Sequence, residues 1–146
     1  MSEEVSKLRF AQDEDEAKKR FEKYEAIDPL PAIPPALLNR ADITDYVAAT
    51  GMIVPFDESD LKPASYGVRL GGKCVYWDAK GDKRVVILSN NIIEKYKNIE
   101  HVTNLKLERN SIAFVSLEPT FRLPYYLALR FNLTDISQIT FSSEQI

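Results

Sequence analysis

The sequence predicts a mainly β fold, a distorted barrel or sandwich, with an N-terminal helix and one further short helix. From Met52 onward, short apolar runs alternate with turn residues roughly every 8 to 15 positions, which is typical of all-β domains. No helical runs separate these predicted strands, so a parallel α/β fold is disfavoured. The 146 residues are sufficient for one domain with a hydrophobic core.

Residues 1–28 are predicted to form a charged helix over Ser2–Asp28. Asp13 can cap it, and Glu16 three residues later can complete a variant of the capping box. Ala17, Phe21 and Tyr24 form a narrow apolar stripe. We interpret this segment as a solvated helix docked lightly on the body; a helix that binds a partner is the alternative. Three i,i+4 charge pairs favour the helix: Glu14–Lys18, Asp15–Lys19 and Glu16–Arg20.

Residues 29–35 contain four prolines and are predicted to be a stiff, extended linker. A Pro-rich ligand for another module is the alternative. The second helix is expected over Arg40–Thr50, because Asn39 is a good N-cap and Gly51 a good C-terminal stop. Residues 36–146 are then expected to form the β domain.

Several apolar runs predict the strands of this domain. Ile112–Leu117 is apolar on both faces, which indicates a central strand. Asp78–Lys83 has the composition of a turn, and Leu123–Leu127 indicates a tight turn or one helical turn. The other predicted strands fall in residues 52–56, 68–77 (broken by two glycines), 85–88, 105–107 and 128–133.

The charge distribution limits the classes of partner. The net charge is −3, and residues 1–28 hold nine acidic and six basic side chains, so the remaining 118 residues are neutral. A neutral body argues against duplex nucleic acid as a partner, whereas a single nucleotide needs only a few donors. No apolar run approaches the length of a membrane span, and the acidic N-terminal segment does not resemble a signal peptide. We therefore expect a cytoplasmic protein with no membrane partner.

Three blocks, in this order, resemble the dCTP deaminase/dUTPase family. Ala36–Ile43 is similar to the leading segment of dCTP deaminases. Leu61–Gly71 is similar to the family's first motif, in which a proline and small residues precede an apolar–Arg–Leu–Gly run. Leu107–Glu118, followed by Phe121–Pro124, resembles the family hairpin and its Leu-Pro turn. The blocks together cover residues 36–133.

The resemblance implies a distorted, dUTPase-like β-barrel that assembles as a trimer, with nucleotide sites between subunits. Members of the family remove the amine from dCTP, hydrolyse dUTP to dUMP and diphosphate, or do both. Mg²⁺ accompanies the triphosphate. The expected partners are therefore a deoxynucleoside triphosphate and further copies of the chain, or a partner chain that supplies missing strands.

This sequence departs from the family pattern at its site residues. Gly67 stands where the first motif normally has an acidic residue. In the stretch that would hold phosphates, Thr134 is a plausible hydroxyl substitute, but Asp135 has the wrong charge and Gln138 replaces a cation. The family's general-base glutamate lies on a later hairpin that would follow Ile146. The resemblance therefore implies nucleotide binding at Thr134, Asp135 and Gln138, without a catalytic residue.

The remaining reactive side chains are interpreted as structural. Cys74 is expected to be a buried thiol, and His101 a surface or loop histidine. The acidic residues of 57–60 are interpreted as a solvated loop, with a weak Mg²⁺ site as the alternative. Tyr125–Tyr126 is expected to pack beside Pro124, although stacking on a base is the alternative.

These observations favour a deoxynucleotide-binding, regulatory or assembly module that is not catalytic by itself. Two alternatives stay open. One is an active deoxynucleotide deaminase or dUTP diphosphatase whose site is substituted or completed between subunits. The other is a protein-interaction module that uses the N-terminal helix.

Overall fold

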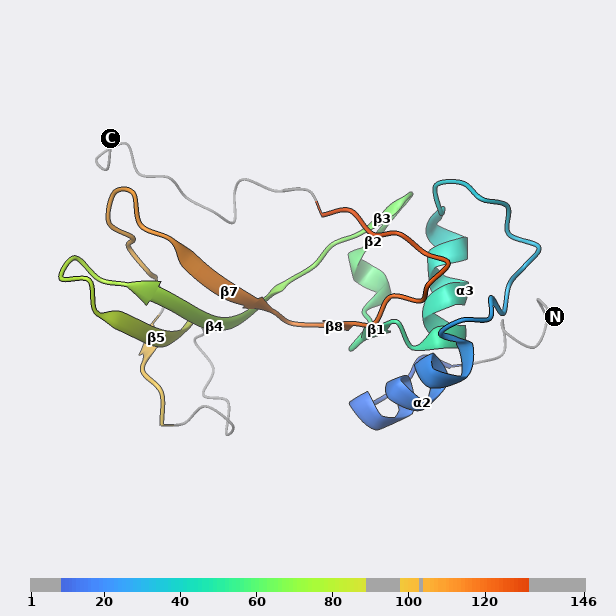
Figure 1. Cartoon of the computed structure of the whole chain (residues 1–146), viewed down its shortest axis with the longest axis horizontal. Coiled ribbons are helices and arrows are strands. Elements are labelled where there is room, and N and C mark those ends of the chain that lie inside the picture. Colours follow the sequence, from blue (N-terminus) through green and yellow to red (C-terminus); the bar gives the residue numbers. More distant parts are fainter. Residues whose placement is uncertain (1–8, 89–97, 103, 132–146) are drawn as a thin grey trace. The chain divides into compact units, whose positions relative to one another are not determined.

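The computed structural model describes residues 9–88, 98–102 and 104–131, and the chain divides into two compact units (Figure 1). Unit 1 comprises residues 1–68 and 119–132, and unit 2 comprises residues 69–118 and 133–146. All three segments expected from the sequence, residues 1–28, 29–35 and 36–146, contribute to unit 1. Leu30 of the Pro-rich segment, for example, lies in the same apolar cluster as Tyr46 and Val47.

Helix α2 spans Glu14–Tyr24. The predicted helix over Ser2–Asp28 is wrong for residues 9–13 and 25–28, which are not helical, and residues 2–8 lie outside the described residues. Asp13 has an extended backbone, and its side chain accepts the N–H of Glu16 at 2.8 Å, which confirms the predicted cap. Glu16 in turn accepts the N–H of Gln12 at 2.9 Å, one residue earlier than in a capping box. Because the Asp13 side chain satisfies the free N–H of Glu16 in the first turn, the helix begins at Glu14.

Helix α3 spans Arg40–Thr50, as the sequence predicts. The Asn39 side chain accepts the N–H of Asp42 at 2.9 Å, and the Asp42 carboxylate accepts the N–H of Asn39 at 3.3 Å. Gly51 ends the helix in the left-handed conformation, at φ 63°, and its N–H donates to the Val47 carbonyl at 2.9 Å.

The core of unit 1 forms around α3 and includes α2. Tyr46 and Val47 on α3 are buried, and Ala17 on α2 has no exposed surface. A Cβ atom at Gly51 would lie 2.6 Å from the Ala17 carbonyl oxygen, so the two helices approach closely only because residue 51 is glycine. Ala17 packs in a small cluster with Ala11 and Val54. The larger buried apolar cluster of unit 1 consists of Leu30, Ile43, Tyr46, Val47, Met52, Ile53 and Leu61.

Two short strand pairs complete unit 1. Strand β1, Ile53–Val54, pairs antiparallel with β8, Thr120–Phe121, and so brings together segments far apart in the sequence (Figure 1). The short 3₁₀ helix η1, Glu58–Asp60, precedes β2, Leu61–Lys62, which pairs antiparallel with β3, Ser65–Tyr66.

Unit 2 contains a four-stranded sheet in the order β6-β5-β4-β7. Strand β4, Leu70–Trp77, and β5, Lys83–Leu88, form a hairpin whose turn is closed by the Asp78 N–H, which donates to the Asp82 carbonyl at 3.0 Å. Strand β7, Ala113–Leu117, pairs antiparallel with β4, and β6, His101–Val102, pairs parallel with β5. The two glycines in β4 do not end the strand, and the β4–β7 register shifts between Leu70 and Cys74.

The described residues thus form small, mainly antiparallel sheets with two α-helices, which confirms the coarse fold class. Within 9–88, 98–102 and 104–131 the strands do not close into a barrel, so the dUTPase-like barrel stays a prediction. Strand β7, predicted to be central, lies at one edge of the described sheet. Residues 105–107 and 128–131 are not strands, because strand structure requires a hydrogen-bonded neighbour as well as apolar residues.

Candidate interaction surface

The three residues predicted to bind a nucleotide, Thr134, Asp135 and Gln138, lie outside the described residues. Gly67, which stands where the family motif has an acid, is described. Its N–H donates to the Asp60 carbonyl at 2.8 Å, and a Cβ atom added to Gly67 would lie 3.3 Å from that same oxygen. A side chain at residue 67 would therefore make a close contact with the Asp60 carbonyl oxygen.

The acidic loop at residues 57–60 has a structural use. The Asp57 carboxylate accepts the N–H of Ser59 at 2.9 Å and its hydroxyl at 2.6 Å, which caps η1. In the described part of the chain, no group of three or more His, Cys, Asp or Glu side chains is arranged to hold a metal ion. The alternative of a Mg²⁺ site in this loop therefore gains no support.

The single cysteine and the single histidine both belong to the sheet of unit 2. Cys74 on β4 has no exposed surface, which confirms the predicted buried thiol, and burial raises its pKa. His101, predicted to be a surface or loop histidine, is half-buried on the two-residue strand β6. A protonated, buried thiol is a poor nucleophile, and Cys74 is therefore structural.

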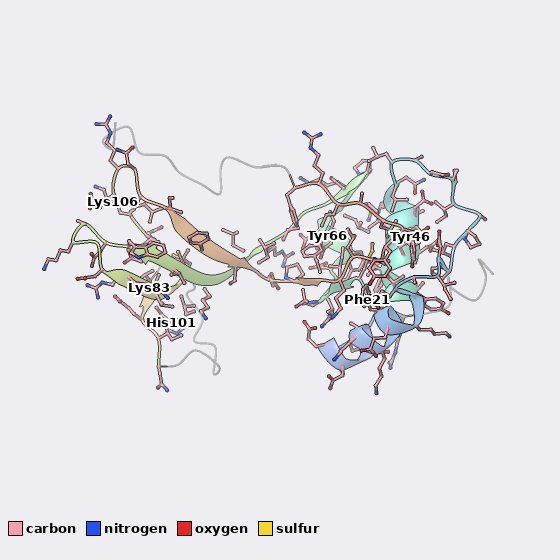
Figure 2. The ribbon with its side chains drawn as sticks, in the orientation of Figure 1. Phe21, Tyr46, Tyr66, Lys83, His101 and Lys106 are labelled. Carbon is pink, nitrogen blue, oxygen red and sulfur yellow. The ribbon has the colours of Figure 1, made fainter. Side chains whose placement is uncertain are left out.

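The tyrosine pair has two different environments. The Tyr126 hydroxyl donates to the Tyr24 carbonyl at 2.7 Å, its ring centroid lies 6.1 Å from that of Tyr46, and burial raises its pKa to about 12. Tyr46, labelled in Figure 2, donates to both carboxylate oxygens of Asp28 at 3.0 Å. Tyr126 is thus a packing residue, whereas Tyr125 is exposed.

Helix α2 uses its apolar stripe and several polar groups within unit 1. Arg20 donates to the Ala48 carbonyl at 2.8 Å and to the Glu16 carboxylate at 2.7 Å. Glu14 accepts from Arg122 at 2.6 Å, which ties the helix to the segment after β8. An external partner would have to displace these contacts to reach the stripe around Ala17.

Among the described residues, part of one face of the sheet of unit 2 is exposed. Residues paired across antiparallel strands lie on the same face, and Val75 is paired with both Val85 and Phe114. Trp77, two residues after Val75, lies on this face as well, and its ring centroid is 6.1 Å from that of Phe114. We call the face formed by these four residues the aromatic face.

Exposure distinguishes the aromatic face from the opposite one. Phe114 is 62% exposed and Trp77 is 40% exposed. On the opposite face, Cys74 and its partner Val86 are both buried. Among the described residues on the aromatic face, only Ile87 is fully buried. The face is exposed toward the end of the hairpin, where Lys83 pairs with Trp77.

The edge strand beside this face, β7, is five residues long and carries no charged side chain. Among the described strands, β7 is paired with β4 alone. Residues 110–117 contain no charged residue and no proline, and the nearest charges are Arg109 and Glu118. Edge strands of soluble proteins normally carry charges, prolines or bulges that prevent association with another strand. The aromatic face and the edge of β7 together are the candidate interaction surface.

Neither a protein-family model, a curated protein nor a solved structure matches the chain. Neither α2 nor α3, the two α-helices in the described ranges, is long and apolar enough to cross a membrane.

Proposed function

We propose that the chain is a dCTP deaminase/dUTPase-like domain that binds deoxynucleotides or assembles with other subunits in the cytoplasm, and that it does not catalyse a reaction by itself. The principal support is the candidate interaction surface. It includes β7, which belongs to the third block resembling the family, residues 107–118.

The physical argument for assembly is the exposed apolar area. Full burial of a side chain such as Phe contributes roughly 1.5–3 kcal/mol, so leaving Phe114 and Trp77 exposed is unfavourable for an isolated subunit. Contiguous exposed apolar patches on soluble proteins commonly mark interfaces. More specifically, we propose that the chain forms a trimer of closed dUTPase-like barrels. Strands from other copies, or from a partner chain, would then cover the aromatic face.

The argument against catalysis by the chain alone comes from the substituted residues. Gly67 has no carboxylate to position Mg²⁺ or water. Asp135 would face a triphosphate with the same sign of charge, so binding requires Mg²⁺ between them. Deoxynucleotide binding is therefore proposed to depend on Mg²⁺ and to leave the nucleotide intact.

A thermal-shift experiment tests nucleotide binding. The melting temperature of the pure protein is measured with dCTP or dUTP, with and without Mg²⁺, and with inorganic triphosphate as the control ligand. A ligand at 100 times its Kd stabilises the folded state by about 2.7 kcal/mol. We expect the melting temperature to rise with a deoxynucleotide plus Mg²⁺. In Asp135→Asn, the difference in melting temperature between samples with and without Mg²⁺ should be smaller. Asp15→Asn, on the exposed side of α2, is the matched control and should behave like the unmodified chain.

Assays for ammonia and diphosphate release test the second part of the proposal. We expect no turnover of dCTP or dUTP by the pure chain. Robust turnover that is lost in Asp135→Ala would establish the alternative of an active enzyme. Absence of both nucleotide stabilisation and self-association would refute the proposal as a whole.

A further inference from the structure

We infer that helix α2 is a strap, which opens and closes as one unit while helix α3 stays folded. Residues 120–126 clamp the strap at both of its ends, and Ala17 is buried only in the closed state. The inference concerns a conformational change within unit 1 and is independent of the proposed nucleotide binding and assembly.

The first residue of α2 forms one end of the clamp. The Glu14 carboxylate accepts a hydrogen bond from the Arg122 guanidinium at 2.6 Å. Hydrogen bonds from Thr120 and from Arg122 lower the pKa of this carboxyl. The backbone N–H of Arg122 donates to the Met52 carbonyl at 2.9 Å. The group that holds Glu14 is therefore fixed to the body of unit 1 beside the β1–β8 pair.

The C-terminal residues of α2 form the other end. The Tyr126 hydroxyl donates to the carbonyl of Tyr24, the last residue of the helix, at 2.7 Å. The Tyr125 N–H donates to the carbonyl of Glu25, the C-cap residue, at 3.0 Å. The last carbonyls of an α-helix have no partner within the helix, so this end of the clamp supplies the donors that they lack.

Between its two ends, α2 buries little apolar surface. Of its eleven residues, all of them described, only Ala17 is buried, whereas six of the eleven residues of α3 are buried. Segments with few buried apolar contacts open at a lower free energy than the core does. An isolated helix shorter than about 12–15 residues is marginal in water, so α2 is expected to unwind along its whole length once it undocks.

Opening changes which surface of α2 a ligand can reach. Ala17 belongs to the apolar stripe that also contains Phe21 and Tyr24, and its side chain is inaccessible in the closed state. A ligand that requires the open state binds with an affinity reduced by the fraction of molecules that are open. The clamp therefore regulates access to the apolar stripe.

Native-state hydrogen exchange of the full chain, followed by NMR at low urea concentrations, tests the inference. The hydrogen-bonded amides of α2 begin at Ala17, whose N–H donates to the Asp13 carbonyl at 3.1 Å. We expect the amides of residues 17–24 to share one opening free energy, lower than that of the amides in α3.

One variant at each end distinguishes a strap from a helix that frays. Glu14→Ala removes the acceptor for Thr120 and Arg122. Tyr126→Phe removes the bond to the Tyr24 carbonyl and keeps the aromatic ring. We expect each variant to accelerate exchange of all amides of residues 17–24 by one common factor, about threefold or more for a lost hydrogen bond.

Tyr66→Phe is the matched control. It makes the same chemical change on β3, where the Tyr66 hydroxyl accepts the Asp57 N–H at 3.1 Å, and it should leave the exchange of α2 unchanged. Circular dichroism establishes that all three variants are folded. The inference is overturned by acceleration confined to the amides nearest the altered residue, by no acceleration, or by α2 amides that are as protected as those of α3.

Discussion

Replacing Gly51 by alanine is expected to undock α2 from α3. A Cβ atom at residue 51 would lie 2.6 Å from the Ala17 carbonyl oxygen and 2.7 Å from the Ala17 Cα. Unstrained carbon contacts lie at about 3.5–4.0 Å, so the helix would have to move by about 1 Å. This movement separates Ala17 from the core and strains the bond from Arg20 to the Ala48 carbonyl.

The magnitude follows from two contributions. Alanine in the left-handed conformation costs roughly 1–2 kcal/mol. Overpacking a close contact costs typically about 1–3 kcal/mol more. Gly81→Ala is the matched control, because Gly81 also has a positive φ, 84°, but no atom lies within 4 Å of its added Cβ. We therefore expect Gly51→Ala to lose about 2 kcal/mol more unfolding free energy than Gly81→Ala.

The assay is urea unfolding followed by two probes. Both described α-helices lie in unit 1, so circular dichroism at 222 nm follows that unit, while fluorescence of Trp77 follows unit 2. Gly51→Ala should shift the circular dichroism transition, and Ala17→Gly should not rescue it, because the atoms in conflict belong to the Ala17 backbone. If Gly51→Ala and Gly81→Ala lose equal stability, α2 does not pack on Gly51 and the docking described above is incorrect.

Three further predictions concern titratable side chains. Cys74 should react with a thiol reagent at least about tenfold more slowly in the native chain than in urea, because it is buried and its pKa is raised; equal rates would contradict its burial. Burial raises the pKa of Tyr126 to about 12, and below its ordinary value of 10 the hydroxyl is protonated in both the folded and the unfolded state. The free energy of unfolding should therefore fall as the pH rises from 10 toward 12. In urea titrations, Tyr126→Phe should make this pH dependence weaker. Glu14, whose pKa is lowered by hydrogen bonds from Thr120 and then Arg122, should stabilise the fold above its ordinary pKa of 4.5 and lose that contribution on acidification. The Glu14 side chain is 53% exposed, so solvent screens its ion pair with Arg122. Glu14→Gln should therefore change the unfolding free energy at pH 7 by less than about 1 kcal/mol. A larger loss would show that the pair is less exposed to solvent than described.

The sequence predicted the candidate site only in part. Strand β7 and the burial of Cys74 followed from apolar patterning, but the exposure of Phe114 did not, because the same apolar run is compatible with a central or an edge strand. The signal that was available is the absence of charge and proline from residues 110–117, together with the neighbouring Trp77 on β4. The nucleotide site at Thr134, Asp135 and Gln138 stays a prediction, since these residues lie outside the described ranges.

Local signals in the sequence were sufficient for α3, with its Asn39 cap and Gly51 stop, for the Asp13 cap of α2, and for the turn at residues 78–82. These features depend on hydrogen bonds between residues close in sequence, so short motifs determine them. The tertiary structure alone decided that Glu14 pairs with Arg122, that β1 pairs with β8, and that β7 lies at the edge of the described sheet. Such contacts join segments as far as 108 residues apart, and which distant segments meet depends on how the whole chain buries its apolar surface.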